Sequence, residues 1–268
     1  MIVIGEKLNS SIPSTLEGLN GKNEDFVAGL AQRQGAAGAQ YLDLNTGMCE
    51  NESEMLVWAA TAALKAAPEC ALMADSTSPE ALRYLFEHVE LKNAAINSVT
   101  LEEDRLSGVL PLVREFKTAI VGMPIDGDGI PKTAERRVEN ARRLIGILRE
   151  NGSEDKDIYI DIVVEAAATG WDAPVKALDA AQALRGEFPD VHLLVGLSNV
   201  SFGLPRRGLI NQTFLACAMA RGVDAAIMDI TNPTMKLHLR AAEMLLGRDE
   251  YCMEYLNAYR ETENGNNA

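Results

Sequence analysis

Short apolar segments recur along the chain, and each one ends at small polar or acidic residues. Residues 191–195 show the pattern well, because β-branched and leucine residues follow one another without alternation, as in a parallel strand buried on both faces. Longer amphipathic stretches separate these segments, several of them opening on helix-capping residues such as Asn23 and Ser78. The predicted strands are, in order, residues 2–4, 40–44, 70–74, 93–96, 119–123, 158–160, 191–195 and 224–228.

Eight strand-helix units in succession predict an α/β fold with a single (β/α)8 TIM barrel. We expect the barrel to occupy residues 1–260 and a disordered polar tail to occupy residues 261–268. The alternative is a doubly wound open sheet, which usually has a glycine-rich first turn. The first turn here is Gly5-Glu6-Lys7-Leu8-Asn9, which contains neither GxGxxG nor a Walker lysine, so the barrel is favoured.

Two loops stand out between the predicted elements. Residues 10–22 are expected to form a turn-rich loop after the first strand. Residues 124–132 form the longest Gly- and Pro-rich stretch, and a loop of that length is more typical of a lid or a binding surface than of a plain connection.

Composition narrows the classes of partner. The chain of 268 residues carries 25 Lys and Arg against 39 Asp and Glu, a formal net charge of −14, which argues against nucleic acid or an anionic membrane as partner. Four cysteines without CxxC spacing indicate no zinc site, and we expect reduced, mostly buried thiols in a cytoplasmic protein. The sequence shows neither an export signal nor an apolar stretch long enough to cross a bilayer.

The residues at the predicted strand ends share one chemistry. In a barrel they converge on one mouth, where ligands bind. They are carboxylates, amides and one serine, without a histidine or an activated nucleophile, which weakens metal-centred and covalent mechanisms. Carboxylates accept paired hydrogen bonds, so this set suits a flat heterocycle rich in N–H groups. The residues are Asp43, Asn45, Asp75, Asn97, Asp161, Ser198, Asn199 and Asp229.

Each of these residues also has an ordinary structural interpretation. Asp75 and Asp161 are compatible with capping the helices that follow them or with pairing to arginine. Asn45 and Asn97 are compatible with turn positions. The positions of these residues at strand ends do not decide between a structural role and ligand binding.

Eight short motifs resemble, in register, the pterin-binding methyltransferases. The similarity extends from residue 2 to about residue 251, and it is greatest to methyltetrahydrofolate:corrinoid/iron-sulfur protein methyltransferase and related corrinoid-dependent enzymes. The motifs are Gly5-Glu6-Lys7-Leu8-Asn9, Leu42-Asp43-Leu44-Asn45, Asp75-Ser76-Thr77, Ile96-Asn97-Ser98, Gly129-Ile130-Pro131-Lys132, Tyr159-Ile160-Asp161, Gly196-Leu197-Ser198-Asn199-Val200-Ser201 and Leu209-Ile210-Asn211.

The resemblance implies methyl transfer between N5 of tetrahydrofolate or methyltetrahydrofolate and the cobalt of a corrinoid (cobalamin) carried by a partner protein. It also implies a homodimer. Asn199 would be the catalytic group, because a donor aimed at N5 stabilises the charge that develops there. An amide does not itself release a proton readily, so Asn199 would assist protonation by hydrogen bonding. The other implied residues are Asp75, Asn97 and Asp161 on the pterin, Gly196 and Ser198 lining its site, and Arg207, or the adjacent Arg206, on the glutamate tail.

Three other functions compete with this one. Dihydropteroate synthase, a related barrel, places a lysine on a late strand and a Ser-Arg pair near the last, whereas the corresponding strands here end in Ser198-Asn199 and Asp229-Ile230. A non-catalytic folate-binding or corrinoid-docking barrel is the second. The third is corrinoid ligation by His192, but the glycine of the DxHxxG pattern falls one position late and His192 begins a strand, away from the mouth.

Overall fold

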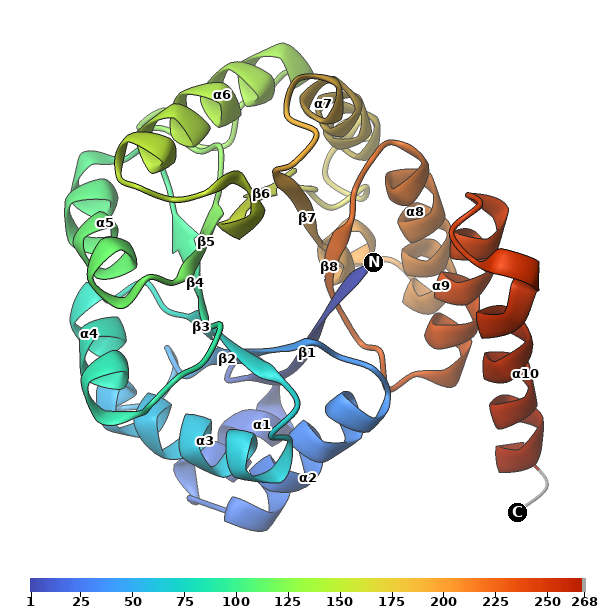
Figure 1. The fold of residues 1–268 in the computed structure, drawn as a ribbon, viewed down its shortest axis with the longest axis horizontal. Helices are drawn as coiled ribbons and strands as arrows, with labels where there is room; N and C mark the ends of the chain where they lie inside the picture. Colours follow the sequence, from blue (N-terminus) through green and yellow to red (C-terminus); the bar gives the residue numbers. More distant parts are fainter. Residues whose placement is uncertain (267–268) are drawn as a thin grey trace.

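The computed structural model describes residues 1–266 and shows a closed parallel barrel (Figure 1). Each strand pairs with its neighbours in sequence, and β8 returns to pair with β1. The strands are β1 Ile2–Asn9, β2 Tyr41–Asn45, β3 Ala71–Asp75, β4 Ala95–Val99, β5 Ala119–Gly122, β6 Ile158–Asp161, β7 His192–Gly196 and β8 Ala225–Met228. The predicted TIM barrel is therefore confirmed.

Helices surround the barrel on its outer side (Figure 1). Four of them begin at a side chain that caps the first turn, namely Asn23, Ser78, Thr133 and Asn232. The helices are α1 Pro13–Asn20, α2 Glu24–Ala36, α3 Glu52–Ala66, α4 Pro79–His88, α5 Glu103–Phe116, α6 Ala134–Glu150, α7 Ala173–Glu187, α8 Arg207–Ala220, α9 Pro233–Leu245 and α10 Met253–Asn266. Within residues 1–266, three 3-10 turns accompany them: η1 Asp155–Asp157, η2 Leu197–Ser201 and η3 Glu250–Cys252.

Apolar side chains fill two layers. The larger layer lies between the strands and the helices, and fully buried Leu42, Leu72 and Leu193 belong to it. The smaller layer fills the inside of the barrel and includes Ile4, Met73 and Leu194. Alternate residues of one strand therefore enter different layers, as in β3, where Leu72 faces the helices and Met73 faces the barrel axis.

Two of the sequence predictions are wrong in part. Residues 10–22 are not a plain loop, because Pro13 starts the short helix α1, which buries Leu19. Helix α10 extends through Asn266, into the segment 261–268 predicted as a disordered tail, and residues 267–268 lie outside the described part. An ion pair of 2.7 Å between Lys236 Nζ of α9 and Glu261 Oε2 holds this helix to its neighbour.

The structure also tests the expected burial of the cysteines and the expected lack of a membrane-spanning segment. Cys49 and Cys70 are buried, but Cys217 is exposed and Cys252 is half-buried, so only two of the four thiols lie in the interior as expected. Among the described residues, no helix is both long enough and apolar enough to cross a membrane.

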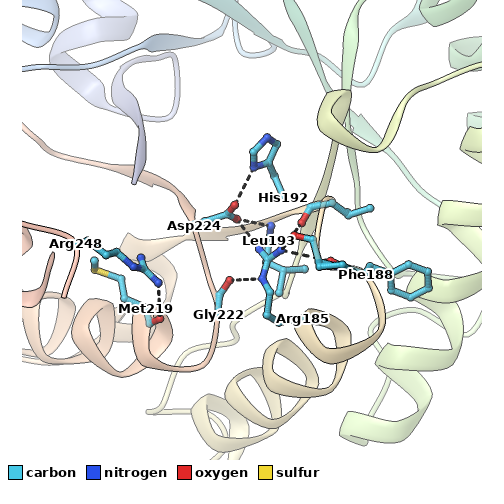
Figure 2. A network of polar contacts seen from close by, with 10 residues as sticks. Arg185, Phe188, His192, Leu193, Met219, Gly222, Asp224 and Arg248 are labelled. Carbon is cyan, nitrogen blue, oxygen red and sulfur yellow. Dashed lines mark hydrogen bonds and ion pairs between the residues drawn. The ribbon is translucent and has the colours of Figure 1, made fainter. Parts of the chain in front are cut away.

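His192 begins β7, at the end of the barrel opposite the mouth, and Figure 2 shows its contact with Asp224. Its Nδ1 is 2.8 Å from Asp224 Oδ2, and its ring stacks on Tyr159 with centroids 4.7 Å apart. Arg185 Nη2 also reaches Asp224 Oδ1, at 3.0 Å. His192 therefore closes the base of the barrel, as its place at the start of a strand predicted.

Candidate functional site

The polar strand ends meet at the carboxyl-terminal mouth of the barrel. Strand register places Asn45, Asp75 and Asn97 side by side, since Asn45 pairs with Asp75 and Asp75 pairs with Asn97. Asp161 ends β6, and Gly196 ends β7. Parallel pairing around a closed barrel puts all these ends on one side, where α/β barrels bind their ligands.

Amide groups tie the carboxylates of β2 and β3 in place. Asn45 Nδ2 donates to Asp75 Oδ2 at 3.0 Å, and Asn97 Nδ2 donates to Asp43 Oδ1 at 3.1 Å. Each amide belongs to a strand next to the strand of its carboxylate or one strand further on. The acceptor atoms are thus held in position by the protein, which favours binding of a planar donor edge.

Burial raises the pKa values of the carboxylates at the mouth. Burial raises the pKa of Asp75 to about 6, with Glu52 adding to the rise while Asn45 and Arg105 oppose it. Burial also raises the pKa of Asp43 well above its usual range, and the charge of Asp75 adds to that rise. The pKa of Asp161 is raised to about 6 by burial, against the opposing effects of the Val163 amide and Arg137. Such raised values cluster at functional sites.

Asp161 is fixed by an unusual turn. Its Oδ1 accepts a hydrogen bond of 2.7 Å from the backbone N–H of Val163, whose φ is 49°. A β-branched residue rarely adopts this left-handed conformation, which costs on the order of 1–3 kcal/mol. The surrounding contacts must impose it.

Asn199 lies on the 3-10 turn η2 that follows β7, and its side chain is exposed. The amide lies close over Gly196, because a Cβ built on that glycine would approach Asn199 Nδ2 to 3.1 Å. The glycine therefore leaves the space that the Asn199 amide occupies. In the described residues no hydrogen bond joins this amide to the carboxylates of the mouth, so its donor group remains available to a ligand.

The two neighbouring arginines differ in their contacts. Arg207 Nη2 donates to the Ser198 carbonyl at 2.7 Å and Nε donates to Ser201 Oγ at 3.0 Å, so this guanidinium supports η2 from the start of α8. It also lies 5.8 Å from the centre of the Phe202 ring. Arg206 is exposed, and within the described chain its side chain makes no such bond. Arg206 is thus the freer of the two cations.

Known proteins that resemble this chain point to the same class of ligand as the polar residues of the mouth. The model of the family described as "Pterin binding enzyme" matches residues 5–229. The chain belongs to this family of pterin-binding enzymes. This bears out the resemblance that the motifs indicated.

Members of the family and solved structures of the same fold resemble the chain closely enough to compare. Methylcorrinoid:tetrahydrofolate methyltransferase of Eubacterium limosum is 36% identical over 264 residues, which are 97% of either chain. Methionine synthase of Mycobacterium tuberculosis is 32% identical over 247 residues, covering 85% of this chain but 20% of that protein. Dihydropteroate synthase of Xanthomonas albilineans superposes with a TM-score of 0.65 at 18% identity over 93% of each chain, a likeness of fold alone.

The mouth of this pterin-binding enzyme also holds two charged side chains, Glu6 and Lys7, that lie outside the predicted set of site residues. Ser198 Oγ donates to both carboxylate oxygens of Glu6, at 3.0 and 2.8 Å. Burial raises the pKa of Glu6, while the Ser198 hydroxyl opposes that rise. Lys7 forms an ion pair of 2.7 Å with Asp229 across β1 and β8. The Gly5-Glu6-Lys7 motif was the available signal, but its partners are far away in sequence.

Among the described residues there is no group of three or more His, Cys, Asp or Glu side chains arranged to hold a metal ion. Two surface hollows of the described residues lie away from the mouth. One, of about 400 Å³, is lined by Trp58 and Tyr84, and the other, of about 620 Å³, is lined by Arg185 and Arg221. We therefore identify the mouth as the candidate site from its buried carboxylates and amides and from the pterin-binding family, not from the size of a hollow.

The raised pKa values predict that the ionised carboxylates of the mouth destabilise the fold at neutral pH. The folded protein retains protons that the unfolded chain loses between about pH 4 and pH 6, so stability falls as pH rises through this window. Asp75→Asn removes one such charge and should raise the free energy of unfolding by about 1–3 kcal/mol at pH 7.5, with little gain at pH 4. Urea unfolding at both pH values measures this.

Asp155→Asn is the matched control, because Arg149 lowers the pKa of Asp155 through a bidentate pair. That substitution should give no gain at pH 7.5. Equal effects of the two substitutions would show that the mouth carboxylates carry no burial penalty.

Proposed function

We propose that the protein transfers a methyl group between N5 of tetrahydrofolate and the cobalt of a corrinoid that a partner protein carries. The observation that carries the proposal is the mouth itself, where carboxylates held by protein hydrogen bonds lie at the same end of the barrel as the exposed amide of Asn199. The relative from Eubacterium limosum bears the name of such an activity, with methylcorrinoid as the methyl donor. Methyl transfer to tetrahydrofolate is accordingly the direction that we propose.

The acids and amides of the mouth would hold the pterin ring. An aminopyrimidinone edge offers adjacent N–H donors, and an ionised carboxylate accepts two of them in parallel. We assign this role to Asp75, Asn97 and Asp161, with Gly196 and Ser198 lining the site. One guanidinium of the pair Arg206 and Arg207 would bind the glutamate tail, as a planar fork suits a carboxylate.

Asn199 would act on the reacting nitrogen. In transfer to folate, the N5–carbon bond forms, the carbon–cobalt bond breaks with its electron pair left on cobalt, and N5 loses its proton. In the reverse direction N5 must gain a proton before the methyl group leaves. A hydrogen bond from Asn199 at N5 stabilises the charge that develops in either direction. The corrinoid supplies the cobalt chemistry, so the protein needs no nucleophilic side chain of its own.

The mouth is bordered by exposed apolar side chains, which supports docking of the protein that carries the corrinoid. Trp171 is 91% exposed, Phe202 70% and Leu209 61%. The segments that carry Trp171 and Phe202 adjoin one another, since Ala167 N donates to the Val200 carbonyl at 3.0 Å, and Leu209 lies in the first turn of α8. Exposed apolar surface of this kind marks interaction sites. The surface lies beside the proposed catalytic group, because the backbone N–H of Phe202 donates to the carbonyl of Asn199.

A structure of this type could also serve a dihydropteroate synthase, because the solved structures that share the fold carry that name. The strand ends oppose this alternative. Ser198-Asn199 and Asp229-Ile230 stand where that enzyme has its lysine and its Ser-Arg pair. A non-catalytic folate carrier is the other alternative, and such a protein would bind folate without changing the spectrum of the cobalt.

Asn199→Ala should reduce the rate of methyl transfer by about 10²–10³-fold, as expected for loss of one transition-state donor. Folate affinity should fall by less than tenfold, because the pterin contacts remain. Absorbance of Co(I) and methyl-Co(III) measures the rate, and calorimetric titration measures the affinity. Asn151→Ala is the control. Asn151 lies at the C-terminal end of α6, and its side chain donates to the Leu110 carbonyl of α5. A wild-type protein that binds folate and never changes the cobalt spectrum would be a carrier.

Trp171→Ala combined with Phe202→Ala should raise the KM for the corrinoid protein at least tenfold, through loss of buried apolar contacts. The rate with free cobalamin should stay unchanged, because it needs no docking surface. Steady-state rates with each methyl donor measure the two effects. An equal loss with both donors would place these side chains in the folate site.

A homodimer is the expected assembly. We propose that its interface includes the exposed apolar side chains of α9 and α10, at the right of Figure 1, where Leu245 is 80% and Met253 50% exposed. Light scattering should then give twice the chain mass of 29.0 kDa, and Leu245→Arg with Met253→Arg should return the single-chain mass. A single-chain mass for the wild-type protein would contradict the assignment.

A further inference from the structure

Arg137 is an arginine of α6 whose side chain is only 1% exposed. A buried guanidinium is tolerated when its donors are saturated, and here every donor nitrogen has a partner. Nε donates to the Pro131 carbonyl at 3.2 Å, Nη1 to the Val163 carbonyl at 2.6 Å and to the Ile162 carbonyl at 3.3 Å, and Nη2 to Glu165 Oε2 at 2.7 Å.

These partners belong to two different loops of the mouth. Pro131 lies in the Gly- and Pro-rich loop between β5 and α6, and residues 162–165 directly follow Asp161 at the end of β6. Arg137 therefore fastens both loops to one helix. The first loop has an independent anchor as well, because Asn140 Nδ2 donates to the Pro124 carbonyl at 3.2 Å and to Asp126 Oδ2 at 2.8 Å.

The second loop depends on Arg137 at the turn that presents Asp161. Val163 has a left-handed backbone, and both of its polar groups are held: the N–H by Asp161 and the carbonyl by Arg137. A β-branched residue keeps such a conformation only where its surroundings impose it. Without the guanidinium, the Val163 peptide is free to relax, and its N–H would leave the Asp161 carboxylate.

We propose that Arg137 is a positioning residue for pterin binding, which fixes the Asp161 carboxylate through the Val163 turn. The inference rests on the proposed function in that Asp161 is taken to accept from the pterin. With Oδ1 occupied by the Val163 amide, Oδ2 is the carboxylate oxygen that remains to accept from the pterin. The positive charge of Arg137 also favours the ionised, accepting form of Asp161.

Arg137→Lys tests this assignment, because lysine keeps the charge but lacks the planar fork that reaches four acceptors. In the protein without ligand, hydrogen exchange of the Val163 amide should accelerate at least tenfold as its bond to Asp161 is lost. Affinity for tetrahydrofolate, measured by calorimetric titration, should fall at least tenfold. Arg149→Lys is the control, since Arg149 lies on the same helix and pairs with Asp155 at the surface.

A second substitution distinguishes positioning from a general loss of structure. Glycine adopts positive φ without strain, so Arg137→Lys combined with Val163→Gly should recover folate affinity to within about threefold of the wild-type value. Val163→Gly alone should bind folate normally. Such rescue is not expected if Arg137 merely holds the fold together.

Two results would overturn the inference. One is unchanged exchange of the Val163 amide in the Arg137→Lys protein, and the other is failure of Val163→Gly to recover the lost affinity. Failure of the proposed function has a different signature, because wild-type protein would then bind no tetrahydrofolate while the exchange of the Val163 amide still responded to Arg137→Lys.

Discussion

The desolvation of carboxylates at the barrel mouth is the constraint on which the rest of the site depends. Asp43, Asp75 and Asp161 are gathered where burial opposes their ionised forms, and the pKa of each is raised in consequence. The protein offsets part of this cost with donors that are themselves fixed by the fold. Asn45, Asn97 and the Val163 amide each supply one hydrogen bond. A ligand that brings further N–H donors would complete the set.

The mouth is divided between two kinds of surface. Strands β2, β3, β4 and β6 contribute the carboxylates and amides, which are rigid because they end on paired strands. The turn after β7 contributes Asn199, next to the exposed ring of Phe202. In the proposed function the pterin lies against the first surface, and the corrinoid approaches over the second. One end of the barrel then serves two substrates that differ greatly in size.

The sequence predicted the barrel because each strand is a short apolar run that ends at polar residues. It also predicted where Asp75, Asn97, Asp161 and Asn199 lie, since the end of a parallel strand fixes the end of the barrel. Helix α1 was missed because it is short and begins at a proline within a turn-rich segment. Disorder of the tail was predicted from its polar composition. Composition does not reveal the ion pair between Lys236 and Glu261, which joins two helices.

Other features could not be predicted because they depend on contacts between distant segments. Glu6 meets Ser198 across 192 positions of the chain, and no local pattern reveals that pair. Arg137 is similar, since a basic residue on an amphipathic helix is expected at the surface rather than 1% exposed beneath two loops. The left-handed Val163 is hidden as well, because β-branched residues disfavour that conformation.

A crystal structure with tetrahydrofolate tests the central claim most directly, because it locates the pterin ring relative to the mouth. The account predicts that the aminopyrimidinone edge lies within hydrogen-bond distance of Asp75, Asn97 and Asp161, and that N5 faces the Asn199 amide. A folate bound elsewhere, or a pterin ring whose N–H edge faces solvent while these carboxylates keep only their protein partners, would contradict it.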